Sequence, residues 1–284
     1  MGAVREGSSW QADIAAASAV AREVGLTNVE PFVLHLSGRT TVRLAPWPIV
    51  ARVLSAFSLE RMMPGVRREL RVAQHLAAKG APTVAPTVDP PPGPYVVGEA
   101  TVTLWTLVEH RKAKGSADAL AAGHALGALH TALADFPERL PLFTQDFNQC
   151  AAFLADTNAL RTLAAADRAF LAGRLDDLQT GLAFDESQLI PLHADAHLSN
   201  VLMTEDGAVW ADLESVCLGP LEWDLTTLPH AARAAFPELD RPLFRQLSLL
   251  RSAIVTVWCA YHAERSPALR AVGAYHLRRL RRLS

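Results

Sequence analysis

The chain has 284 residues, enough to bury a core in one large domain or in two lobes. Half of its residues are hydrophobic, and the formal net charge of -2 gives it no general attraction to nucleic acid or to an anionic membrane surface. Its three cysteines lie far apart, which argues against a disulfide framework and a thiolate zinc site. Because MGAVREGSSW also has no basic-then-apolar signal pattern, we expect a cytoplasmic protein with neither nucleic-acid nor membrane partners.

The first third of the chain combines helical patterns with short β-like runs. Apolar residues recur at helical spacing over 10–26, and Gly25 is a suitable stop. Three runs separated by turn residues then predict an antiparallel meander: PFVLHLSG, TTVRLAP and PIVARVLS. A helix over 65–79 ends at Gly80, and a proline-rich loop covers 82–94. YVVG and TVTLWTLV follow as two further strands.

From about Ser116 the pattern becomes helical, with Ala/Leu periodicity. Helices are predicted over 116–133, 145–157 and 164–180, and again from 224 to the C-terminus. The region 190–212 interrupts them. We therefore expect an α+β protein with a small antiparallel-sheet lobe over 1–107, a mainly helical lobe over 108–284, and a connector near 107–115.

The interrupting region contains HADAHLSN (193–200), with two histidines and an aspartate at alternating positions. Alternate residues of an extended chain face the same side, so His193, Asp195 and His197 can converge. Three interpretations are open: a zinc site, a polar turn whose histidines bond to backbone, and the kinase catalytic-loop pattern H-x-D-x-x-x-x-N ending at Asn200. The third explains most of the sequence that follows.

The residues after Asn200 favour phosphoryl transfer. VLMTEDGAVWADLES predicts a strand, a turn at Asp206-Gly207, and a second strand ending in Asp212. Such a hairpin brings Asp212 back beside Asn200. Two oxygen ligands then lie next to each other, as a magnesium–nucleotide complex requires. Asp195 supplies the carboxylate that orients an attacking hydroxyl and accepts its proton. The sequence therefore predicts ATP and Mg²⁺ as cofactors.

At these residues the chain resembles the aminoglycoside phosphotransferase/choline kinase-like family, which comprises small-molecule kinases with a two-lobed protein-kinase-like fold. LHADAHLSNVL, WADLES and GPLEWDL carry the resemblance. It implies that Asp195 is the catalytic base and that Asn200 and Asp212 hold magnesium. It also implies that Asp224 is a buried carboxylate bracing the catalytic-loop backbone. His197 stands where protein kinases carry a lysine near the transferred phosphate, so a phosphate contact and a structural turn are both open.

Protein-kinase activity itself is disfavoured by the same region. Glu214 replaces the glycine of D-F-G, no A-P-E follows, and eleven residues between Asp212 and Asp224 leave no room for an activation segment. In the resembling family D-x-E can support a second metal ion or the substrate. Glu214 is therefore a candidate metal ligand, with a surface carboxylate as the alternative.

The resemblance places the nucleotide in the first lobe. LSGRTTV, between the first two strands, could cover phosphates through Ser37, Gly38 and Thr41, although a plain hairpin turn also explains a sequence that is not G-x-G-x-x-G. The strand TVTLWTLV leads into the connector, where kinase-like folds offer backbone N–H and C=O groups to adenine. We expect these groups at Thr106 and Val108.

Glu69 lies within the apolar stripe of the helix over 65–79, three residues after Val66. A carboxylate that faces a core needs a cation or several donors. The family supplies a lysine from the third strand, which also contacts the α- and β-phosphates. Here IVARV puts Arg52 in that place, so we expect Arg52 to pair with Glu69 and to replace the lysine.

These features predict a phosphotransferase that moves the γ-phosphate of ATP to a hydroxyl of a small molecule, either an aminoglycoside-like antibiotic or a hydroxylated metabolite. The alternative is a pseudokinase, which binds a nucleotide or metabolite without turnover. Arg52 favours the alternative, whereas the combination of Asp195, Asn200 and Asp212 favours catalysis. A hydrolytic metalloenzyme built on His193, Asp195 and His197 is a more distant possibility.

Three features outside the motif can be interpreted as structural or as functional. Four aromatic residues could line the acceptor pocket or pack in the core: Trp223, Trp258, Tyr261 and His262. His130, on an Ala/Leu helix, is expected to be an interior histidine. The C-terminal HLRRLRRLS is expected to form a solvated amphipathic helix, with binding of an acidic partner as the alternative.

Overall fold

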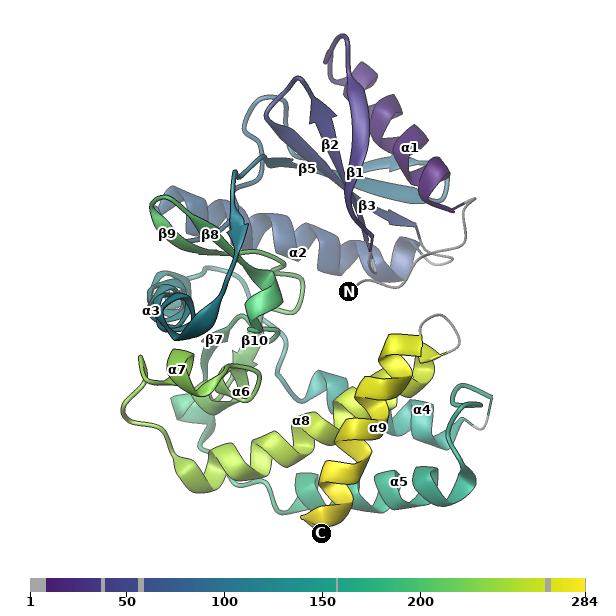
Figure 1. Ribbon diagram of the computed structural model, residues 1–284, viewed down its shortest axis with the longest axis vertical. Coiled ribbons are helices and arrows are strands. Elements are labelled where there is room, and N and C mark those ends of the chain that lie inside the picture. Colours follow the sequence, from purple (N-terminus) through teal and green to yellow (C-terminus); the bar gives the residue numbers. More distant parts are fainter. Residues whose placement is uncertain (1–8, 37–38, 56–58, 157, 264–266, 284) are drawn as a thin grey trace.

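The computed structural model describes residues 9–36, 39–55, 59–156, 158–263 and 267–283. Its first lobe is built on a five-stranded sheet in the order β1-β2-β3-β5-β4, in which every neighbouring pair is antiparallel (Figure 1). The strands are β1 (Glu30–Leu36), β2 (Thr40–Ala45), β3 (Ile49–Ser55), β4 (Tyr95–Val97) and β5 (Ala100–Thr106). The predicted meander and the two further strands are therefore confirmed.

Two helices cover opposite faces of this sheet. They are α1 (Ser9–Glu23) and α2 (Leu59–Ala78). Side chains alternate along β3, so that Ala51 and Val53 join the core under α1, whereas Val50 packs in the same cluster as Leu70 of α2. Arg52, two residues after Val50, shares the α2 face. One face of the sheet is thus covered by α1, and the other face is turned toward α2 and the second lobe.

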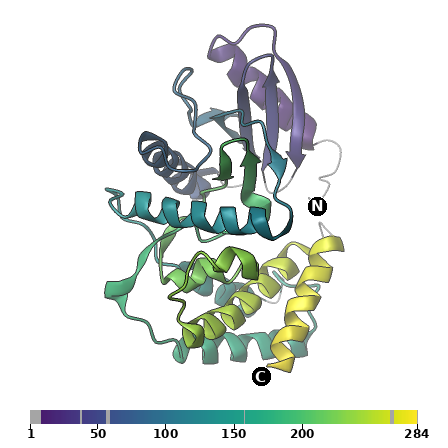
Figure 2. The ribbon, with the colours of Figure 1, turned by 60° about the vertical axis from the view of Figure 1, so that its left-hand side comes forward.

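The second lobe is mainly helical. Its first helix, α3 (Gly115–Leu133), runs across the molecule beneath a small sheet in the order β6-β8-β9 (Figure 2). The strands of that sheet are β6 (Arg111–Lys112), β8 (Val201–Thr204) and β9 (Gly207–Trp210). A separate pair consists of β7 (Ile190–Leu192) and β10 (Cys217–Gly219). The other helices are α4 (Gln145–Ala155), α5 (Ala165–Thr180), α6 (Leu221–Leu225), α7 (His230–Arg233), α8 (Arg241–Tyr261) and α9 (Pro267–Arg282).

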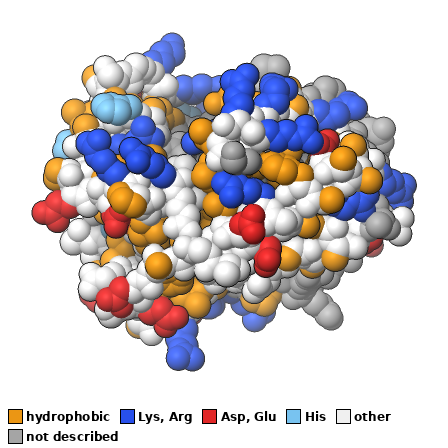
Figure 3. Space-filling model, turned by 90° about the horizontal axis from the view of Figure 1, so that it is seen from below, with side chains coloured by type: hydrophobic (Ala, Val, Ile, Leu, Met, Phe, Trp, Pro, Cys, Tyr) orange, Lys and Arg blue, Asp and Glu red, His pale blue; other side chains and the backbone are white. Residues whose placement is uncertain are grey.

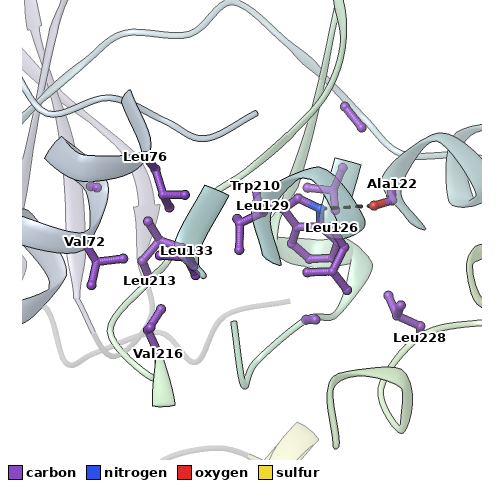
Figure 4. Packing of buried hydrophobic residues seen from close by; sticks show 14 of the residues in the cluster. Val72, Leu76, Ala122, Leu126, Leu129, Leu133, Trp210, Leu213, Val216 and Leu228 are labelled. Carbon is purple, nitrogen blue, oxygen red and sulfur yellow. Dashed lines mark hydrogen bonds between the residues drawn. The ribbon is translucent and has the colours of Figure 1, made fainter. Parts of the chain in front are cut away.

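One hydrophobic core joins the two lobes (Figure 4). Leu76 of α2 packs in the same cluster as Leu129 of α3 and as Leu213, which follows β9. Trp210 is completely buried in this cluster, and its Nε1 donates a hydrogen bond to the carbonyl oxygen of Ala122 at 3.1 Å. Because Trp210 is the last residue of β9, this core fixes the position of the chain that follows it.

The C-terminal helix α9 is amphipathic and solvated, as predicted. Leu280 is buried, Arg281 pairs with Asp167 of α5, and Arg278 and Arg282 are exposed. Figure 3, which views the molecule from below, shows Lys and Arg side chains spread over this end. Within the described part of the chain, no helix combines the length and the apolar character that crossing a bilayer requires.

Candidate active site

A buried carboxylate holds the loop between β7 and β8. Asp224 of α6 is 0% exposed and accepts hydrogen bonds from the backbone N–H groups of His193 at 2.9 Å and Ala194 at 2.6 Å, and from Nε2 of His130 at 2.7 Å. Burial alone would raise the pKa of Asp224, but the hydrogen bond and charge of His130 lower it. Ala194 has a φ of 65°, an unfavourable value for alanine, so these bonds hold a strained loop. The bracing role that the resemblance implies and the interior position of His130 both agree with this geometry.

His193 is committed to the backbone. Its side chain is buried, Nε2 lies 3.0 Å from the carbonyl oxygen of Ala211, and Nδ1 accepts the Asp195 N–H at 3.3 Å. The ring also packs edge-on against Trp210, with the centroids 5.1 Å apart. Both ring nitrogens are therefore occupied, which contradicts the zinc interpretation of the motif. Among the described residues, no group of three His, Cys, Asp or Glu side chains is placed to hold a metal ion.

Asp195 is half-exposed at the mouth of the loop. Asn200 donates from Nδ2 to the Asp195 carbonyl oxygen at 3.0 Å and to Oδ2 at 3.2 Å, and Nε2 of His197 lies 3.4 Å from Oδ2. Burial raises the pKa of Asp195, but the hydrogen bond and charge of His197 lower it to about 2. Conversely, burial lowers the pKa of His197, and the bond to Asp195 raises it above its ordinary value. When His197 is protonated, the two side chains form a carboxylate–imidazolium pair.

The β8–β9 hairpin brings Asp212 back to Asn200, as predicted. Val201 pairs with Trp210 in the ladder, and the next residue, Ala211, donates its N–H to the Asn200 carbonyl oxygen at 2.9 Å. Asp212 itself has a φ of 66°, in the left-handed region that aspartate tolerates better than most residues.

The hairpin turn lies one residue earlier than predicted. Thr204 pairs with Gly207, so the two turn residues are Glu205 and Asp206. Gly207, with a φ of 128°, starts the second strand rather than completing the turn.

The residues beside this loop suit a hard cation. Because the amide nitrogen of Asn200 faces Asp195, its oxygen is turned the other way and can serve as a ligand. This oxygen and the carboxylates of Asp212 and Glu214 are hard oxygen donors, the ligand type that Mg²⁺ takes when phosphates complete its coordination.

Five charged side chains form what we call the ion-pair cluster. Arg52 pairs through Nη1 with Oε1 of Glu69, and through Nη2 with Oδ1 of Asp212 at 2.7 Å. Arg39 pairs through Nη1 with Oε2 of the same Glu69, and through Nη2 with Oε2 of Glu214. The predicted Arg52–Glu69 pair is present, and Glu69 is completely buried. Arg39, which lies just before β2, was missed by sequence reasoning.

The electrostatics of the cluster keep Arg52 charged. Burial lowers the pKa of Arg52, but the charges of Glu69 and Asp212 more than reverse this effect and raise it. The guanidinium also lies 5.6 Å from the ring centroid of Trp105. Arg52 therefore offers a permanent positive charge at the place where the resembling family has a lysine.

The expected nucleotide contacts are placed as follows. Thr41 pairs with Arg52 across the β2–β3 ladder and so shares its face of the sheet. Thr106 already donates its N–H to Ala85 at 2.9 Å, which leaves only its carbonyl for adenine. The Val108 carbonyl oxygen lies 2.7 Å from Nδ1 of His110. The backbone N–H of Val108 makes no hydrogen bond within the part of the chain that the structure describes.

Ser37 and Gly38 lie outside the described residues.

The four aromatic residues divide between core and surface. Trp223 is 1% exposed, packs against Phe143 and Phe147, and lies under the Arg251 guanidinium, which is 3.5 Å from its ring centroid. Tyr261 instead stacks on Phe153, with the ring centroids 4.3 Å apart. Trp258 and His262 stack beside this pair. A cavity of about 430 Å³ adjoins the stacked rings of Tyr261 and Phe153. Its lining also includes Asp156 and Arg161.

The fold and the loop geometry together define the class of protein. A sheet lobe that presents a buried glutamate, placed over a helical lobe that presents an aspartate–asparagine loop and a hairpin followed by a second aspartate, is the arrangement of protein-kinase-like phosphotransferases. The model of the phosphotransferase enzyme family, APH, matches residues 25–256. The chain belongs to this family, and it is a small-molecule kinase. No curated protein sequence matched it.

Solved structures show the same fold at low sequence identity. Amicoumacin kinase hAmiN, in complex with AMP-PNP, Ca²⁺ and Ami, superposes with a TM-score of 0.73 at 11% identity, over 96% of this chain and 95% of that chain. The GDP and kanamycin complex of APH(2")-IIia gives 0.70 at 13% identity, over 95% and 99%. Choline kinase LicA from Streptococcus pneumoniae gives 0.70 at 12% identity, over 94% and 98%. The predicted α+β, two-lobed, protein-kinase-like fold is confirmed.

Proposed function

We propose that the protein transfers the γ-phosphate of ATP, bound with Mg²⁺, to a hydroxyl group of a small molecule. One observation carries the proposal: Asp195, Asn200 and Asp212 meet at one end of the hairpin, and Arg52, braced by Glu69, contacts Asp212 from the other lobe. The side chains that we assign to the acceptor, the metal ion and the phosphates therefore lie in one place. The complex of hAmiN with AMP-PNP and Ca²⁺ supports an adenine nucleotide and a divalent cation.

The nucleotide is assigned to the sheet lobe and its connector, with the boundary between lobes at residues 107/108. The Thr106 carbonyl and the Val108 N–H would bind the adenine edge, and Arg52 would bind phosphate oxygens. The segment with Ser37, Gly38 and Thr41 would cover the phosphates. Bound Mg²⁺ neutralises charge on the phosphates, and the residues that would hold it are Asn200, Asp212 and Glu214.

Asp195 would bind the acceptor hydroxyl and orient it toward the phosphate. With a pKa of about 2 it is ionised and is a weak proton acceptor. Phosphoryl transfer has a loose transition state, in which orientation and charge matter more than early proton removal. His197, whose pKa Asp195 raises, would contact the transferred phosphate in its protonated form.

The pseudokinase alternative has no specific observation in its favour. The sequence feature that favours it is Arg52, yet Arg52 pairs with Glu69 as the lysine of the family does. We infer that Arg52 preserves activity.

An ATP-consumption assay tests the proposal and narrows the acceptor. The wild-type protein should consume ATP only with Mg²⁺ and only with an acceptor from a panel of aminoglycosides, amicoumacin, choline and other hydroxylated metabolites. Asp195→Asn is the matched control, because it keeps the shape of the side chain and removes its charge. ATP binding without turnover across a broad panel would favour the pseudokinase, and hydrolysis that Asp195→Asn leaves unchanged would contradict the assigned role.

A further inference from the structure

The ion-pair cluster has two arginines where one cation would suffice to satisfy Glu69. Each arginine uses both of its terminal nitrogens. One nitrogen contacts Glu69, and the other contacts a carboxylate that we assign to magnesium: Asp212 for Arg52, and Glu214 for Arg39. A lysine could not make this bridge in the same way, because its donors sit on a single nitrogen.

The cluster has inner contacts, which the two arginines make to Glu69, and outer contacts, which they make to Asp212 and Glu214. The inner and outer contacts differ in burial. The side chains of Glu69, Arg39 and Arg52 are 0%, 9% and 15% exposed, whereas those of Asp212 and Glu214 are 34% and 45% exposed. A buried carboxylate that loses its cations is strongly destabilised, but an exposed ion pair contributes little because water screens it. The contacts to Glu69 are therefore the permanent part of the cluster, and the outer contacts are the part that can exchange.

We propose that Arg39 is a second phosphate-binding residue and that the outer arms of both arginines exchange partners when the nucleotide binds. In the free protein the arms neutralise Asp212 and Glu214. In the nucleotide complex they bind phosphate oxygens, for which a guanidinium fork is well suited, and leave the two carboxylates to Mg²⁺. This inference rests on the proposed function and adds a residue to it.

Partner exchange has a thermodynamic consequence. Mg²⁺ alone must compete with two guanidinium groups for its carboxylate ligands, and a nucleotide alone must draw those groups away from the carboxylates. When both ligands bind together, each satisfies the groups that the other displaces. Mg²⁺ and nucleotide should therefore strengthen each other's binding, by the same factor in both directions.

The decisive experiment titrates Mg²⁺ alone, AMP-PNP alone and the two together by calorimetry. In Arg39→Gln the affinity for Mg²⁺–AMP-PNP should fall about 10-fold or more, the usual effect of losing a charge-assisted hydrogen bond. The affinity for Mg²⁺ alone should rise, because a competitor for Glu214 is gone. Arg39→Lys should recover part of the nucleotide affinity.

Arg71→Gln is the matched control, because Arg71 lies on α2 near Glu69 but pairs with Glu138 at 2.5 Å outside the cluster. It should leave both affinities unchanged. Opposite changes in metal and nucleotide affinity in Arg39→Gln would support partner exchange, since a merely structural role would weaken both. Parallel loss of both affinities, or no change in either, would overturn the inference while the proposed function stands. If the wild type does not bind Mg²⁺–AMP-PNP, the proposed function fails as well.

Glu214→Gln covers the case in which Arg39→Gln does not fold. It removes the outer partner of Arg39 and leaves the Arg39–Glu69 pair intact. AMP-PNP without metal should then bind more tightly than to the wild type, because the arm of Arg39 is already released. Weaker or equal binding would overturn the exchange.

Discussion

The two sides of the candidate site are held together by different forces. In the helical lobe, hydrogen bonds between buried side chains and backbone fix the catalytic loop, with Asp224 and His193 at their centre. In the sheet lobe, ion pairs around Glu69 fix the phosphate side. The loop follows the kinase pattern closely, whereas the phosphate side departs from it by using arginines in place of a lysine.

The difference reflects what each side must do. A hydroxyl must be aimed at phosphorus within a fraction of an ångström, so the residues that aim it need many fixed bonds. Phosphate oxygens carry diffuse charge, and any well-placed cation can neutralise it. We therefore expect substitutions on the phosphate side to cost less activity than substitutions in the catalytic loop.

The largest expected effect lies in the catalytic loop. Asp195→Ala should lower turnover by about 10²–10⁴-fold, the usual contribution of a positioned acid–base group, while ATP affinity changes little because this carboxylate serves the acceptor. Single-turnover kinetics measure the first quantity and calorimetry the second. Phosphate transfer at the wild-type rate in the variant would refute the assignment.

Asp212→Ala should affect both sides of the site. It removes a proposed metal ligand and also the outer partner of Arg52, so Mg²⁺-dependent ATP binding should weaken and turnover should be lost. Calorimetry with and without Mg²⁺ separates the two contributions. ATP binding and turnover that do not depend on Mg²⁺ in the wild type would rule out the metal site.

Asp224→Ala should mainly reduce stability. It leaves two buried N–H groups and the buried His130 without their acceptor, at a cost of about 3–5 kcal/mol in the free energy of unfolding. Urea denaturation measures this loss. Asp206→Ala, in the exposed hairpin turn, is the control and should change stability by less than about 0.5 kcal/mol. Equal stability of the two variants would show that the loop does not depend on Asp224.

Arg52→Ala should have a smaller effect on stability, because Arg39 remains as a cation for Glu69. We expect a loss of about 1–3 kcal/mol and a weaker thermal shift with Mg²⁺–ATP. Adding Glu69→Gln should recover part of the stability, and Arg52→Lys should lie between the wild type and Arg52→Ala. If Arg52→Ala melts like the wild type and shows the same ATP-induced shift, Arg52 has neither role.

The smallest expected effect is on pH dependence. The pKa of His197 is raised above its ordinary 6.5, so stabilisation by its pair with Asp195 is complete below that pH and is lost as the pH rises through the raised value. Turnover should decline over the same range if the imidazolium contacts the transferred phosphate. His197→Gln should lack this alkaline limb of the pH–rate profile. A profile identical to that of the wild type would assign His197 a purely structural role.

Sequence patterns predicted well which groups meet beside the loop between β7 and β8, for a physical reason. The spacing from Asp195 to Asn200 and the hairpin after it are local, so a short stretch of sequence determines which groups meet. The Glu69–Arg52 pair could also be predicted, because a carboxylate in an apolar stripe requires a cation and only one lay at the right place on the third strand.

The remaining features depend on contacts between distant segments. Arg39 sits in a turn-like sequence, and nothing local indicates that its side chain reaches Glu69 and Glu214, 30 and 175 residues further along the chain. The helix predicted over 65–79 is longer in the structure, because α2 begins at Leu59 and continues through Pro64. The hairpin turn differs by one residue from the predicted one because Gly207 pairs with Thr204 and so belongs to the second strand.

The core shared by α2 and the segment after β9 has a consequence for folding during synthesis. Leu76 of α2 is covered partly by Leu213 and Val216, which leave the ribosome more than a hundred residues later. The sheet can pair early and α3 can cover part of α2, yet the apolar side of α2 is not fully covered until that segment emerges. We therefore expect nascent chains ending before residue 213 to bind chaperones through α2, and chains that extend well past 228 to be released from them.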